Sequence, residues 1–198
     1  YFNKTFLTNF STERKTLLII GGSLGAGTIN QSIIVHLKAL IESNIQVIWQ
    51  TGKNYFADCK TALEKCQWLN TNSPIICTDF VSQMPLAYAL ADLVISRAGA
   101  SSISELCLLG KPAILVPSPN VAEDHQTHNA MALVNKNAAV LVKDKDAQNN
   151  LIPIALQLIK DNQKLLDLHT NILGLSLPDS ARIIAAEVIK LATKNRNN

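Results

Sequence analysis

Short apolar runs alternate with amphipathic stretches up to about residue 142. The runs are rich in isoleucine, leucine and valine, which is typical of strands that are buried on both faces of a sheet. The pattern predicts strands at residues 16–20, 46–50, 74–77, 93–95, 113–116 and 139–142.

Apolar residues at helical spacing lie between and after these runs. They predict helices at residues 28–43, 55–66, 102–109, 124–135, 151–161 and 163–171, one with Pro85 in its first turn, and a last helix that follows Pro178 and ends near Lys194. Strands that alternate with helices form parallel βαβ units with right-handed crossovers. The expected fold is therefore α/β, with one doubly wound, Rossmann-like sheet of parallel strands.

A glycine-rich segment follows the first strand and precedes a helix: residues 21–27, Gly-Gly-Ser-Leu-Gly-Ala-Gly. A strand, a glycine loop and a helix in this order put phosphate oxygens at a helix N-terminus. The segment has neither the Lys-Ser/Thr pair of a Walker loop nor the GxGxxG spacing. A phosphate-binding loop and a tight turn without a ligand both remain open.

A second segment of small residues follows the fourth strand: residues 97–105, Arg-Ala-Gly-Ala-Ser-Ser-Ile-Ser-Glu. We expect Gly99 to let the backbone approach a ligand and Ser101 or Ser102 to cap the next helix. Glu105 then lies one turn into that helix, where its carboxylate either favours the helix dipole or holds sugar hydroxyls. The alternative is that a serine and Glu105 form only a capping pair.

These two segments leave the carboxyl ends of parallel strands, where doubly wound sheets bind their ligands. We therefore expect both to face one crevice. Two anion-binding loops at one edge, with an acidic residue beside them, suit a nucleotide that carries a diphosphate.

Composition and charge narrow the class of protein. The chain has 198 residues, of which 47% are apolar and 17% charged, and this is typical of a globular domain. A net charge of +3 with scattered basic residues argues against nucleic acid as a partner. The four cysteines lack CxxC spacing, so buried free thiols are favoured over disulfides or a metal site. We expect no metal and no cofactor.

No apolar stretch approaches the roughly 18 residues that cross a bilayer, and no signal-peptide pattern opens the chain. We therefore expect a soluble protein, or one that touches a membrane only through a surface patch.

Three motifs in order resemble the MurG family of bacterial peptidoglycan glycosyltransferases. They are the loop 21–26 with Asn30, the segment 91–100 with Ser104-Glu105 and residues 110–112, and Pro117 followed by Asp124-His125-Gln126 and Asn129-Ala130. The resemblance covers essentially the whole chain. It implies the C-terminal, donor-binding half of a two-domain GT-B enzyme, occupying residues 1–198 and without the N-terminal half.

The resemblance implies transfer of N-acetylglucosamine from UDP-N-acetylglucosamine to an undecaprenyl-diphosphate-linked muramyl-pentapeptide, with inversion, in peptidoglycan synthesis. It implies a peripheral location on the cytoplasmic face of the bacterial inner membrane. The acceptor and membrane contacts belong to the N-terminal half, and the last helix, residues 179–194, is positioned to pack on that half. Two alternatives stay open: a UDP-sugar binding module that is inactive alone, and a protein like the UDP-N-acetylglucosamine 2-epimerases.

Residue roles follow from the same resemblance. Ser23 is expected to bond the donor diphosphate, and the backbone of Val81 to meet the uracil. The segment Ala100, Ser101, Ser102, Ile103 and Ser104 lines the diphosphate and ribose, and Glu105 accepts hydrogen bonds from the ribose hydroxyls. Gln126 reads the sugar hydroxyls with Asn129 nearby, although both residues suit simple helix caps as well.

The chain departs from the family pattern at two positions of the first loop. Leu24 replaces a polar residue, and Gly27 stands where many relatives carry arginine, which removes a cation near the phosphates. No residue of the chain is nominated as the general base. His125 is adjacent to the sugar-recognition residues, but a histidine before a helix is usually a capping or solvated residue. We expect the base to come from the N-terminal half.

Overall fold

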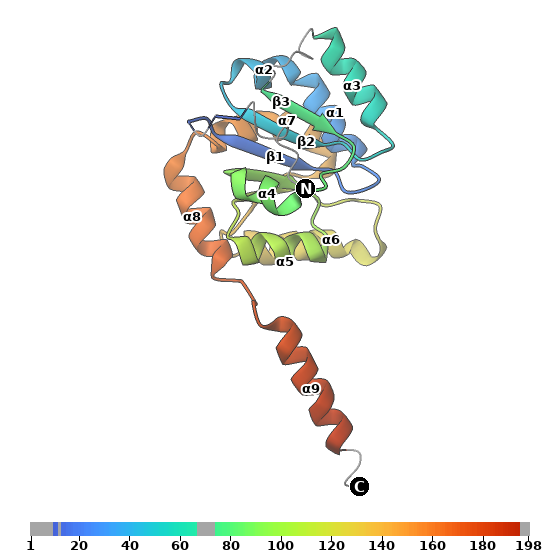
Figure 1. Cartoon of the computed structure of the whole chain (residues 1–198), viewed down its shortest axis with the longest axis vertical. Helices are drawn as coiled ribbons and strands as arrows, with labels where there is room; N and C mark the ends of the chain where they lie inside the picture. The colour runs from blue at the N-terminus through green and yellow to red at the C-terminus, as the bar shows by residue number, and fades with distance from the viewer. Residues whose placement is uncertain (1–9, 12, 67–73, 195–198) are drawn as a thin grey trace.

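The computed structural model describes residues 10–11, 13–66 and 74–194. Its centre is a sheet of parallel strands in the order β3-β2-β1-β4-β5-β6 (Figure 1). The strands are β1 (Thr16–Ile20), β2 (Gln46–Gln50), β3 (Ile75–Thr78), β4 (Leu93–Ser96), β5 (Ala113–Leu115) and β6 (Val140–Leu141). The predicted doubly wound, Rossmann-like sheet is confirmed, and β1 and β2 have the predicted bounds.

Helices cover both faces of the sheet (Figure 1). One face packs against α1 (Gly27–Val35), α2 (Leu37–Glu42), α3 (Phe56–Lys65) and α7 (Asp144–Leu158). The other packs against α4 (Met84–Leu90), α5 (Ala100–Leu109) and α6 (His125–Val134). A short 3₁₀ helix, η2 (Ala122–Asp124), precedes α6, and α8 (Asn162–Leu173) reaches both cores.

Alternate residues of β1 enter the two cores, because successive side chains of a strand point to opposite faces. Leu17 and Ile19 belong to the core under α1 and α7, and Leu18 and Ile20 to the core under α4 and α5. All four are buried. This two-sided burial explains why the strand is continuously apolar and not alternating.

The largest differences from the predicted helices lie at α1 and α7. The helix expected at 28–43 is divided at His36 into α1 and α2. Side chains compete for helix carbonyls there: Ser32 Oγ donates to the Thr28 carbonyl, and His36 Nδ1 lies 2.9 Å from the Ser32 carbonyl oxygen. The helix expected from 151 begins instead at Asp144, because Asp144 and Asp146 in its first turn favour the helix dipole although no apolar period marks that turn.

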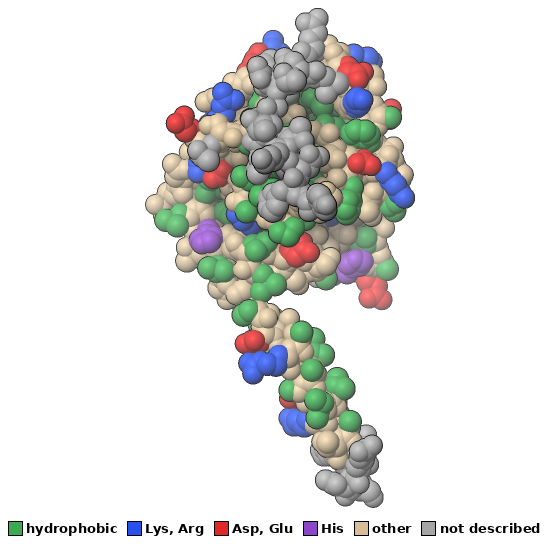
Figure 2. All heavy atoms as spheres, viewed as in Figure 1, with side chains coloured by type: hydrophobic (Ala, Val, Ile, Leu, Met, Phe, Trp, Pro, Cys, Tyr) green, Lys and Arg blue, Asp and Glu red, His purple; other side chains and the backbone are tan. Residues whose placement is uncertain are grey.

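The last helix, α9 (Ser180–Lys194), projects away from the body (Figure 1). Hydrophobic side chains run along one side of it and charged ones along the other (Figure 2). Ile183, Ile184, Val188, Ile189 and Leu191 are all exposed. The predicted helix is present, but the described residues do not bury its apolar side. None of the described helices has both the length and the apolar character to span a bilayer.

Candidate functional site

The two segments of small residues lie side by side. β1 and β4 are parallel neighbours with Ile20 opposite Ser96, so the chain leaves both strands at the same edge. The strand order also reverses there, since β2 lies on one side of β1 and β4 on the other. This is the switch point at which doubly wound sheets hold ligands. The predicted convergence of residues 21–27 and 97–105 is confirmed.

Close packing holds the first loop in its shape. Gly25 has a φ of +100°, and a Cβ there would collide with the Thr51 carbonyl and the Tyr55 ring. Asn30 on α1 fixes the loop from below, because its Nδ2 donates to the Thr51 carbonyl at 2.8 Å and its Oδ1 accepts from Trp49 Nε1 at 2.9 Å. Ser23 remains exposed at the tip, and its carbonyl accepts from the Lys53 amide.

The second segment begins α5 without a side-chain cap. The N-cap residue is Gly99, so neither Ser101 nor Ser102 caps the helix, and that expectation is wrong. The helix starts at Ala100, earlier than predicted, because Gly99 in an extended conformation already allows the turn. The first four amides of any helix lack an intrahelical partner, so this end presents N–H groups at the edge. Ser101, Ser102 and Ile103 lie in that first turn, and Ser104 Oγ donates to the Ala100 carbonyl.

Glu105 is not half of a capping pair. Its Oε2 accepts a hydrogen bond from the Tyr88 hydroxyl of α4 at 3.0 Å, and the carboxylate is otherwise exposed. Burial, followed by the nearby Glu105 charge, raises the pKa of Tyr88, so the phenol stays a donor to the carboxylate. No local pattern signals this pair, because Tyr88 and Glu105 lie on different helices.

Gln126 and Asn129 join α6 to the two adjacent loops. Gln126 Oε1 accepts from the Ser118 amide after β5, and Asn129 Nδ2 donates to the Ala98 carbonyl after β4. Neither residue is the N-cap of α6, which is Asp124. His125 is exposed, and its Nδ1 lies 2.8 Å from the Ala122 carbonyl oxygen within its own turn.

Val81 follows β3 at the same edge and is buried. Its N–H donates to Gln50 Oε1 at 2.9 Å. Gln50 is the last residue of β2, so this bond fixes the segment between β3 and α4 to the carboxyl end of its neighbouring strand.

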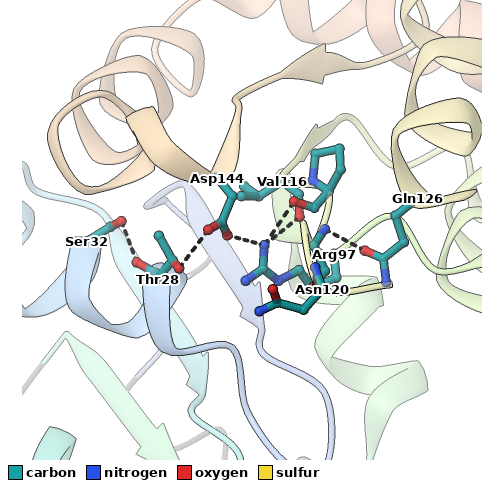
Figure 3. A network of polar contacts seen from close by, with 9 residues as sticks. Thr28, Ser32, Arg97, Val116, Asn120, Gln126 and Asp144 are labelled. Atoms are coloured by element: carbon teal, nitrogen blue, oxygen red, sulfur yellow. Dashed lines mark hydrogen bonds and ion pairs between the residues drawn. The ribbon is translucent and has the colours of Figure 1, made fainter. Parts of the chain in front are cut away.

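A polar cavity of about 360 Å³ opens between the first loop and the loop after β5. Its lining includes residues 25–28, Tyr55, Arg97, Asn120, Gln126 and Asp144. Arg97 and Asp144 form an ion pair in its wall, and Thr28 Oγ1 donates to the same carboxylate (Figure 3). The sequence analysis did not identify Asp144, because no local pattern connects it with Thr28 or Arg97, which are distant in the sequence.

Comparison with known proteins identifies the fold family. Residues 16–181 match the Glycosyltransferase family 28 C-terminal domain. The chain belongs to glycosyltransferase family 28. The predicted resemblance to the MurG family is confirmed by relatives within family 28, each named as UDP-N-acetylglucosamine--N-acetylmuramyl-(pentapeptide) pyrophosphoryl-undecaprenol N-acetylglucosamine transferase.

The relative from Parabacteroides distasonis is 54% identical over 93% of this chain and 49% of its own length. The relative from Bacteroides fragilis strain ATCC 25285 is 56% identical over 92% of this chain and 48% of its own length. This family 28 chain therefore spans about half the length of the curated relatives that it matches.

Solved structures agree with the family 28 assignment. The crystal structure of Acinetobacter baumannii MurG superposes with a TM-score of 0.76 at 26% identity, covering 91% of this chain and 51% of that one. A putative UDP-N-acetylglucosamine 2-epimerase from Listeria monocytogenes superposes with a TM-score of 0.67 at 12% identity, covering 92% of this chain and 46% of that one. The second likeness shows a shared fold alone.

Proposed function

We propose that this chain is the donor-binding half of an inverting glycosyltransferase. The enzyme transfers N-acetylglucosamine from UDP-N-acetylglucosamine to an undecaprenyl-diphosphate-linked muramyl-pentapeptide in peptidoglycan synthesis. The observation that carries the proposal is the convergence of two anion-binding loops at the switch point, beside a polar cavity. Relatives with this activity in their names, at 54% and 56% identity, support the choice of reaction.

The donor diphosphate binds between the two loops. Ser23 and the neighbouring amides bond it from the first loop, and the first turn of α5, residues 100–104, bonds it from the second. Helix N-termini favour negative charge, and fixed donors stabilise the charge that grows on a leaving diphosphate. Catalytic power in this half therefore lies in leaving-group stabilisation.

The nucleoside and the sugar lie on either side of the diphosphate. Glu105, oriented by Tyr88, accepts from the ribose hydroxyls. Gln126 and Asn129, already bonded to the two adjacent loops, read the sugar hydroxyls. Val81 meets the uracil through its backbone. Because Gln50 takes the Val81 N–H, the base bonds the Val81 carbonyl or displaces the Gln50 side chain.

The general base, the acceptor site and the peripheral contact with the cytoplasmic face of the membrane belong to the other half of the protein. The same proposal assigns the exposed apolar side of α9 to packing on that half. The chain by itself then binds donor and does not turn it over.

Calorimetry with UDP-N-acetylglucosamine tests the donor site. Ser23→Ala removes the hydrogen bond to the charged diphosphate, and Glu105→Ala removes the carboxylate that accepts from the ribose hydroxyls. Each variant is therefore expected to bind at least about tenfold more weakly. Ser43→Ala and Glu64→Ala are matched controls, because Ser43 precedes β2 and Glu64 lies at the end of α3, away from the carboxyl ends of the strands, and both are expected to bind like the wild type. Unchanged affinity in Ser23→Ala and Glu105→Ala contradicts the assignment.

Turnover separates the transferase from its alternatives. The chain is incubated with UDP-N-acetylglucosamine and a lipid-linked acceptor, with and without the N-terminal half of a relative. Product that forms only with both halves supports the proposal. Donor binding without product under either condition supports a binding module, and conversion of the donor to UDP-N-acetylmannosamine supports the epimerase.

A further inference from the structure

Four segments of the chain meet at the ion pair of Arg97 with Asp144, the first residue of α7. Asp144 Oδ2 accepts from Thr28 Oγ1 at 3.0 Å, and Thr28 lies in the first turn of α1, directly after the glycine loop. Asp144 Oδ1 accepts from Arg97 Nη1, and Arg97 directly follows β4. The same Nη1 donates to the carbonyls of Val116 at 3.1 Å and Pro117 at 3.2 Å, after β5 (Figure 3).

The contact is shielded from solvent. The Arg97 and Asp144 side chains are 19% and 18% exposed, so their attraction is screened less than that of a surface pair. Both side chains also line the polar cavity. Removing one partner of a largely buried ion pair leaves the other charge without its counterpart, so the arrangement around the pair depends on both residues.

The strand pairing alone does not fix the relative positions of the loops that follow the strands. The ladder between β1 and β4 ends at Ile20 and Ser96, and the two loops extend beyond it. Asp144 connects the first turn of α1 to Arg97 in that region, and Arg97 extends the connection to the loop that contacts Gln126 through Ser118. One carboxylate thus relates the glycine loop, the second loop and the loop after β5 to one another.

We infer that Asp144 is a positioning residue for the diphosphate site. It holds the N-terminus of α1 and the start of the second loop at the separation at which both present their donors to the same phosphates. This inference rests on the proposed function. It assigns a role to a residue outside the three motifs, and the ligand chemistry concerned is a nucleoside diphosphate.

The test compares ligands that differ only in phosphate. Thr28→Val removes the hydroxyl with little change in shape, and Asp144→Ala removes the carboxylate. UDP affinity of the 198-residue chain is expected to fall about tenfold in both, because small misplacements of binding groups are costly. Uridine affinity, measured by NMR titration, is expected to stay within about twofold, because the nucleoside contacts lie elsewhere.

Ser32→Ala is the matched control. Ser32 Oγ donates to the Thr28 carbonyl at 2.8 Å, in the same turn of α1, without touching Asp144. Its UDP affinity is expected to stay within about twofold of wild type. Asp144→Asn keeps an acceptor for Arg97, so it is expected to recover part of the loss. The double variant Thr28→Val with Asp144→Ala is expected to be no worse than Asp144→Ala, because Asp144→Ala already removes the contact that Thr28→Val breaks.

Two results overturn the inference alone: UDP affinity that is unchanged in Thr28→Val and Asp144→Ala, or a loss for uridine as large as that for UDP. Should Asp144→Ala fail to fold, Thr28→Val and Asp144→Asn decide the question. A wild-type chain that does not bind UDP overturns the proposed function and the inference together.

Discussion

At the scale of single residues, the site depends on polar side chains that hold loops as much as on those that face a ligand. Asn30 is the clearest case. Asn30 belongs to the first motif of the family, and the structure explains its role there. Its side chain is buried and bonds both Trp49 and the Thr51 carbonyl beneath the glycine loop. Its side chain replaces backbone partners that a sharp turn cannot offer.

Replacing Asn30 by leucine is expected to destabilise the chain. The change leaves the Trp49 N–H and the Thr51 carbonyl buried without partners, at a cost of about 1–3 kcal/mol each. Urea unfolding followed by tryptophan fluorescence measures the loss. The control is Gln31→Leu, an exposed position on the same helix, where a change within about 0.5 kcal/mol is expected. Equal stability of Asn30→Leu and wild type would contradict the structural role.

At the scale of elements, the strands were the most predictable part and the helix starts the least. A strand buried on both faces has a continuous apolar centre, such as Leu17–Ile20 in β1 and Val47–Trp49 in β2, and the predicted bounds of both strands agree with the structure. The first turn of α7 has no apolar period, because its polar residues face the cavity and solvent, and the prediction missed it. Likewise, the N-cap of α5 depends on the conformation of Gly99, which the serine-rich sequence concealed.

The packing of α3 on the sheet predicts a pH dependence. Cys59 of α3 is buried, and burial together with the charge of Asp58 raises its pKa from 9.0 to about 12. The unfolded chain loses this proton from about pH 9, whereas the folded chain keeps it. The free energy of unfolding therefore falls as the pH rises from 9 to 12, by up to about 1.4 kcal/mol per pH unit.

Urea unfolding at pH 8.5 and at pH 10.5 measures this effect, with Cys59→Ala as the comparison. The difference between their pH slopes reports Cys59 together with its effect on Cys77, whose pKa is raised by burial and then by the Cys59 charge. The wild type is expected to lose about 1–2 kcal/mol more than the variant over this interval. Parallel slopes would show that the thiol has the same pKa in both states.

At the scale of the whole molecule, the described residues form a layered sheet, and α9 lies outside it. The body buries two cores, while α9 leaves an apolar side uncovered by the described residues (Figure 2). The chain matches about half the length of its relatives, so we expect the other half to cover this helix. That packing stays a prediction.

Lysine substitution on α9 tests it. Ile184 is 64% exposed, so Ile184→Lys is expected to change the unfolding free energy of the 198-residue chain by less than about 0.5 kcal/mol. Joined to the N-terminal half of a relative, the same change is expected to cost about 1–3 kcal/mol, because it buries a charge. Thr193→Lys, on the opposite side of α9, is the control and is expected to be neutral in both. Equal effects of both changes in the joined protein would contradict the packing.

The sequence by itself determined the α/β class, the strands, the two loops and the family, because these depend on local patterns: apolar runs, glycines between a strand and a helix, and short motifs in order. Only the tertiary structure decided which side chains support the loops. Asp144 lies 116 residues from Thr28 and 47 from Arg97, and Glu105 meets Tyr88 from another helix. Such pairs have no local pattern, since strand order and helix packing alone bring them within hydrogen-bond distance.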